Sequence, residues 1–188
     1  MKIRRRLTAL LAAALVALFA MPVLADDGKD GLKFVPKDTM MVITIDVENL
    51  KGTSLFKDFM DAITSDSEAK EGIEKLEKAT GFDMEKDLKS IVIAVPPDVE
   101  KTENWLVVSK ASVDEKKFVK FVEDEGSKIT EGTHEGVTWY EIDKEATMAF
   151  VGDHIIVGPK PALKAAIDTS KGKMKDVTSN SDVNDLIK

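Results

Sequence analysis

Two histidines and their acidic neighbours are the residues of this chain whose types could do acid–base or metal chemistry. His134 lies in the segment 131–135 (EGTHE), where one imidazole is close to two carboxylates, the ligand types that zinc binds. The segment contains a glycine and is typical of a loop, and His154 is the only other histidine that could complete a site. The sequence therefore favours a solvated loop histidine over a metal centre, and we expect no metal ligands and no cofactor.

Asp153 precedes His154 at a turn between two expected strands, where aspartate is a turn former as well as a possible partner for an imidazole. The chain has no Gly-x-Ser-x-Gly elbow and no glycine-rich phosphate-binding loop. It also has no cysteine, which excludes thiol catalysis. These absences favour a protein that is not an enzyme, with a hydrolase that lacks a recognisable motif as the third alternative.

Residues 1–25 have the pattern of a signal peptide. Lys2 and the arginines at 4–6 precede an apolar run over 7–20, and the small residues at 23–25 fit a cleavage site. The run is shorter than the roughly 20 residues of a membrane span. We expect cleavage after Ala25, no membrane span afterwards, and a periplasmic or secreted protein; an uncleaved anchor is the alternative.

The charge of the expected mature chain limits its partners. Residues 1–25 contain four of the 27 basic residues, including every arginine, and none of the 34 acidic ones, so the remainder carries a net charge of −11. An acidic chain without arginine is poorly suited to phosphate and base contacts. The composition therefore excludes nucleic acid as an expected partner.

The spacing of apolar residues predicts strands and helices in alternation. Helices are expected after a cap at Thr53 or Ser54, from residue 67 to Gly81, after a capping box at 112–115, and from Pro161 to Gly172. Strands are expected over residues 41–47, 90–95, 105–111, 137–142, 148–151 and 154–157.

This order predicts an α+β fold with a ferredoxin-like βαββαβ core, an antiparallel sheet and helices on one face. The other face would then be open, unless the remaining strands or the C-terminal segment cover it. Alternate strand positions on that face mix apolar and polar residues, which indicates a docking surface. The expected interaction residues are Val42, Thr44, Leu106, Val108, Tyr140 and Ile142.

Three aromatic residues suggest an alternative function. Trp105, Trp139 and Tyr140 lie on strands that could be neighbours, and together they could stack a small ligand or a polysaccharide. Because aromatic residues on strands are usually part of the core, this binding module is the second hypothesis.

The domain organisation follows from these segments. We expect a signal peptide over 1–25, a flexible lead-in over 26–33, and one α+β domain over 34–178. Residues 179–188 have a cap and the first apolar positions of a helix, so they are expected to begin a further helix or a truncated second unit.

The motifs F-V-P-K-D-T at 34–39, T-G-F-D at 80–83 and K-D-L at 86–88 resemble those of uncharacterised exported bacterial proteins, which are classed as domains of unknown function. The strand at 136–140 and the helix entry at 158–167 fit the same pattern. The resemblance implies an envelope or secreted domain, often duplicated, with no established activity and no catalytic residues to carry over.

The sequence thus predicts an exported, non-catalytic protein-interaction or structural module. Its expected partner is another envelope protein or a second copy of the domain.

Overall fold

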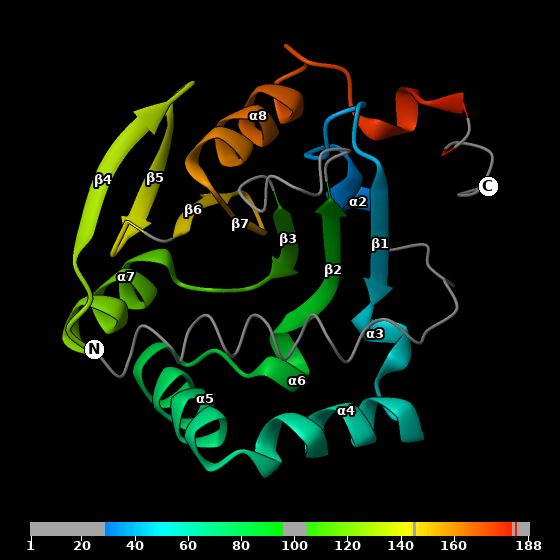
Figure 1. Cartoon of the computed structure of the whole chain (residues 1–188). Coiled ribbons are helices and arrows are strands. Elements are labelled where there is room, and N and C mark those ends of the chain that lie inside the picture. The colour runs from blue at the N-terminus through cyan, green and yellow to red at the C-terminus, as the bar shows by residue number, and fades with distance from the viewer. Residues whose placement is uncertain (1–28, 96–104, 145, 182, 184–188) are drawn as a thin grey trace.

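The computed structural model describes residues 29–95, 105–144, 146–181 and 183, which form one seven-stranded sheet with helices packed against it (Figure 1). All neighbouring strands are antiparallel, in the order β1-β2-β3-β7-β6-β5-β4. The strands are β1 (Met41–Asp46), β2 (Leu88–Val95), β3 (Leu106–Ala111), β4 (Ile129–His134), β5 (Val137–Ile142), β6 (Ala146–Val151) and β7 (His154–Gly158). The predicted α+β class is confirmed, whereas the expected signal peptide lies outside the described residues.

The strand order corrects the ferredoxin-like prediction. In a ferredoxin-like core, another strand lies between the two strands that a helix connects. Here β1 and β2 are direct neighbours, and Asp46 at the end of β1 lies opposite Ser90 near the start of β2. The helical segment between them therefore leaves and re-enters the sheet at the same end, as a long hairpin connection.

That connection contains α3 (Val47–Leu50), α4 (Ser54–Ser65), α5 (Ser67–Thr80) and α6 (Met84–Asp87). Thr53 caps α4, because its side chain accepts a hydrogen bond from the backbone N–H of Phe56. Gly81 follows α5 with φ of +78°, the left-handed conformation that glycine adopts without strain. The start of α4 and the end of α5 therefore agree with the sequence prediction.

Helices cover both faces of the sheet, not one face as predicted. On the first face, called here the α8 face, α2 (Lys29–Leu32) contacts β2 and β3, and α8 (Lys160–Ser170) contacts β6 and β7. The apolar side chains buried there are Leu32, Phe34, Val35, Val92, Ala94, Leu106, Val108, Val137, Trp139, Ala149, Ile156, Leu163, Ala166, Ile167 and Val177.

On the opposite face, called here the α7 face, α7 (Glu115–Asp124) covers one half of the sheet, and Leu50 of α3 and Phe56 of α4 pack against the other half. Phe118 and Val122 of α7 pack with Tyr140 and Met148 of the sheet. The backbone N–H of Lys117 bonds the side chain of Asp114, so Asp114 caps α7 and the predicted capping box at 112–115 does not form. Because both alternate sets of strand residues are apolar, each face buries a core.

The segment before β1 is more ordered than expected. Residues 26–33 are predicted as a flexible lead-in, but Lys29–Leu32 forms α2, and Leu32 is buried in the core of the α8 face. The chain then runs beside the C-terminal segment, where the backbone N–H of Val177 donates to the carbonyl of Val35. Val177–Ser179 is a short 3₁₀ helix, and most of the predicted terminal helix lies outside the described residues.

Candidate functional site

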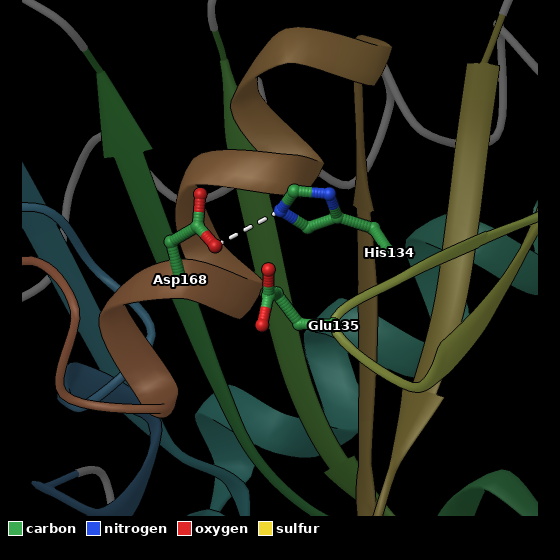
Figure 2. A group of neighbouring side chains, drawn as sticks. All are labelled: His134, Glu135 and Asp168. Carbon is green, nitrogen blue, oxygen red and sulfur yellow. Dashed lines mark hydrogen bonds and ion pairs between the residues drawn. The ribbon is translucent and has the colours of Figure 1, made fainter.

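One cluster of metal-ligand side chains stands at the turn between β4 and β5, against the last turns of α8 (Figure 2). His134 is the last residue of β4, Glu135 is the first residue of the turn, and Asp168 comes from the helix. His134 Nε2 lies 2.9 Å from Asp168 Oδ1, and the closest ligand atoms of all three residues lie within 4.8 Å of one another. Within the described ranges, this is the group of histidine and acidic side chains that could hold a metal ion.

The hairpin register directs His134 toward α8. His134 lies opposite Val137 and Gly132 lies opposite Trp139, and both partners on β5 belong to the core of the α8 face. A Cβ built on Gly132 would lie 2.1 Å from the Trp139 ring, so only glycine lets the indole pack against this strand. Strand alternation then places the His134 side chain on the same face as Gly132.

The connection between β4 and β5 is a two-residue turn with positive φ at both positions. Glu135 has φ of +51° and Gly136 has φ of +76°, which is the pattern of a type I′ turn. Glycine adopts such a conformation freely, but a glutamate pays a steric penalty there. The turn holds the Glu135 carboxylate beside the His134 imidazole, as Figure 2 shows.

The end of α8 fixes Asp168. Leu163, Ala166 and Ile167 are fully buried in the sheet core, so the helix is held firmly against β6 and β7. The helix ends in a Schellman motif, in which the N–H of Lys173 donates to the carbonyl of Asp168 and Gly172 has φ of +73°. This motif turns the chain back, so Lys173 lies near the cluster.

Lys173 supplies a positive charge to the cluster. Its Nζ lies 2.6 Å from a carboxylate oxygen of Glu135. About half of the Lys173 side chain is exposed to solvent, whereas His134 and Asp168 are each about one quarter exposed. The cluster is therefore shallow and reachable from solvent, with one imidazole, two carboxylates and one ammonium.

This arrangement offers several groups that could bind a ligand. An imidazole paired with a carboxylate can act as a general base toward water or toward a hydroxyl within reach. The hydroxyls that follow Asp168 in the chain are occupied, since Thr169 donates to the carbonyl of Ala165 and Ser170 to that of Ile167. Imidazole nitrogen and carboxylate oxygen remain as groups that could coordinate a cation.

His154 is in a different environment at the start of β7. Its Nδ1 lies 2.8 Å from a carboxylate oxygen of Asp153, and its ring packs on Phe34 with the centroids 4.9 Å apart. The Nε2 atom is buried and has no hydrogen-bond partner within the described part of the chain. Burial lowers the pKa of His154 despite the nearby Asp153 carboxylate, so the imidazole is neutral and structural.

The six predicted interaction residues do not form one exposed surface. Leu106 and Val108 are buried on the α8 face, whereas Tyr140 and Ile142 are buried on the α7 face. Val42 and Thr44 are only partly buried, on edge strand β1. The prediction assumed a sheet with one open face, and the helices on both faces remove that possibility.

The predicted aromatic platform is also not assembled. Trp139 lies on the α8 face beneath Lys160, whose Nζ is 4.3 Å from the ring centroid. Tyr140 points to the opposite face, where its hydroxyl donates to Glu115 at 2.8 Å and burial raises its pKa to about 12. Trp105 directly precedes β3, outside the sheet.

The sequence analysis singled out two of the three residues of the cluster. It singled out His134 and its acidic neighbours, but it missed Asp168, which is 34 residues away and meets His134 only because α8 packs beside the β4–β5 hairpin. The only sequence feature that marks Asp168 is its position next to Ile167, on the flank of a predicted amphipathic helix.

Within the described residues, no helix is both long and apolar enough to cross a membrane.

Comparison with known proteins gives one match. A family model described as "Protein of unknown function (DUF3352)" matches residues 6–188. No curated protein and no solved structure matches the chain. The match covers nearly the whole sequence and agrees with the resemblance to domains of unknown function.

Proposed function

The chain belongs to the DUF3352 family of proteins of unknown function, and from this premise we propose that it is an exported, non-catalytic domain that works by protein–protein contact. The signal-peptide pattern over residues 1–25 supports export to the periplasm or beyond. The partner is a second copy of the domain or another envelope protein, and the contact is made through the edge of the sheet.

Edge strand β1 is the observation that carries this proposal. β1 is the last strand on its side of the sheet, and among the described residues no strand pairs with its outer side. Its sequence, MVITID, has strong β propensity, and its only charge is Asp46 at the end. An edge of this kind presents unpaired backbone donors and acceptors to which a strand of another protein can add.

β1 lacks the features that usually protect an edge strand. Proteins prevent unwanted pairing with lysine, proline or bulges in the edge strand. β1 contains no lysine or proline, and its pairing with β2 runs without a register shift from Met41 to Asp46. At the other edge, β4 has the sequence ITEGTH, in which polar residues and a glycine make pairing weaker.

Two of the six predicted interaction residues remain in the proposal. Val42 and Thr44 belong to β1 and are partly buried, so they lie where an added strand would contact the sheet. The other four, Leu106, Val108, Tyr140 and Ile142, are buried and belong to the hydrophobic core.

An in-cell crosslinking experiment tests the proposal. The full-length protein is crosslinked in its natural cells and the partners are identified by mass spectrometry. Thr44→Lys places a charge on edge β1 and is expected to lower the yield of the crosslinked partner strongly. The matched control, Thr130→Lys on edge β4, should leave the yield unchanged. Equal yields from both variants, or no partner at all, would contradict contact through β1.

A further inference from the structure

We propose that His134, Glu135 and Asp168 form a binding site for a divalent transition-metal cation, with zinc as the ion that fits them best. This inference goes beyond the proposed protein contact and is independent of it, since the cluster lies at the β4 end of the sheet, away from β1. It also departs from the sequence analysis, which expected no metal ligands.

The ligand types select the class of cation. One imidazole nitrogen and two carboxylate oxygens make a mixed set, and imidazole favours zinc and its transition-metal neighbours. Calcium and magnesium prefer sites made of oxygen ligands alone. The cluster contains no thiolate, so copper(I) and iron–sulfur chemistry do not fit.

The geometry needs only side-chain adjustment to reach a metal site. The three ligand atoms lie within 4.8 Å of one another. Tetrahedral zinc with bonds of about 2.0–2.1 Å places its ligand atoms about 3.3 Å apart. His134 Nε2 and Asp168 Oδ1 are already 2.9 Å apart, so the main movement is that of the Glu135 carboxylate.

The two elements that carry the ligands are held firmly. The β4–β5 hairpin is fixed by Trp139 against Gly132, and α8 is fixed by the buried residues Leu163 and Ile167. A site on such elements is preorganised, because binding has to order little backbone. Three protein ligands also leave a fourth position for water or for a group from another molecule.

Lys173 acts as an internal cation that a metal must displace. Its ammonium holds one of the Glu135 carboxylate oxygens at 2.6 Å, as a bound cation would. Because Lys173 is about half exposed, it can move into water with little loss of free energy. Binding also replaces the hydrogen bond in which His134 Nε2–H donates to Asp168 Oδ1, so the neutral imidazole must exchange its Nε2 proton for one on Nδ1 before Nε2 can coordinate the metal.

Isothermal titration calorimetry, in which zinc chloride is added to the purified protein, tests this site. We expect one zinc ion per chain. His134→Gln and Asp168→Asn should each weaken binding by at least about tenfold, since even the loss of an outer partner of a metal ligand has an effect of about 10–100-fold. Lys173→Ala should strengthen binding by about 1.5- to 5-fold, because it removes the competing ion pair.

Asp124→Asn is the matched control. Asp124 is an exposed carboxylate that pairs with Lys120 on α7, so this variant changes the charge by the same amount without touching the cluster. Circular dichroism and thermal unfolding confirm that each variant is folded. The site is disproved if the wild-type protein shows no saturable zinc binding, if His134→Gln binds as well as wild type, or if Asp124→Asn weakens binding as much as Asp168→Asn.

Discussion

The surroundings of the two histidines differ, although each is paired with an aspartate. His134 Nε2 lies 2.9 Å from Asp168, and His154 Nδ1 lies 2.8 Å from Asp153. His134 is 23% exposed and has a second carboxylate beside it, whereas His154 is 2% exposed and packs on Phe34.

This difference shows that a carboxylate partner does not by itself define the role of a histidine. Desolvation lowers the pKa of the buried imidazole, and its other nitrogen has no hydrogen-bond partner among the residues that the structure describes, so it contributes to packing. A solvent-reachable imidazole with two carboxylates can exchange its partners for a cation. Burial and the number of neighbouring ligands therefore separate the structural histidine from the candidate ligand.

The largest expected effect is on stability. His154→Ala should destabilise the fold by about 2–4 kcal/mol, because it leaves a cavity next to Phe34 in the core. His134→Ala should change the free energy of unfolding by less than about 1 kcal/mol, because its side chain is partly exposed. Urea unfolding of both variants measures the difference, and equal losses would remove the distinction between the two histidines.

A second prediction concerns the strand that carries His134. Gly132→Ala should destabilise the protein by about 1–3 kcal/mol, because the new Cβ would lie 2.1 Å from the Trp139 ring. The fluorescence of Trp139 should also change in the Gly132→Ala variant. Thr130→Ala, at an exposed position of the same strand, is the control and should stay within about 0.5 kcal/mol of wild type. A neutral Gly132→Ala would show that the indole does not fix the hairpin.

The third prediction is a pH dependence that arises from His154. Its folded-state pKa is lowered from 6.5 by burial, so below pH 6.5 the unfolded state binds the proton more readily than the folded state. Its stabilising contribution is complete above pH 6.5 and is lost as the pH falls toward the folded-state pKa. The slope should reach at most about 1.4 kcal/mol per pH unit.

Several charged groups influence this titration. Asp153 and Asp30 favour the protonated form of His154, and Lys33 and Lys110 oppose it, but burial is the largest effect. Comparing unfolding of wild type and His154→Leu between pH 7.5 and 5 isolates the contribution. If both proteins lose stability equally, His154 is not the titrating group.

Much of the fold could be predicted from local patterns. Strands β1, β2, β3, β5, β6 and β7 were recognised from apolar runs, and Thr53 and Gly81 mark helix ends as expected. β4 was missed because ITEGTH has only one strongly apolar residue, and its strand conformation depends on pairing with β5. The sequence analysis did not predict helices on both faces of the sheet. The apolar residues Val92 and Val108 on the second face already indicated that this face is buried as well.

The candidate site was harder to predict than the fold, since it depends on tertiary packing. His134 and Glu135 are neighbours in the sequence, but Asp168 and Lys173 reach them only through the position of α8 and its C-terminal turn. No local pattern states which turn of a helix will lie beside which hairpin.

The most direct test of the zinc site uses the fact that the chain has only two histidines. Their imidazole signals can be assigned by NMR with His134→Gln as the reference, and zinc chloride is then added at neutral pH. If zinc binds at the cluster, the His134 signals shift and those of His154 stay in place. Unchanged His134 signals, or an equal shift of both histidines, would contradict the zinc site.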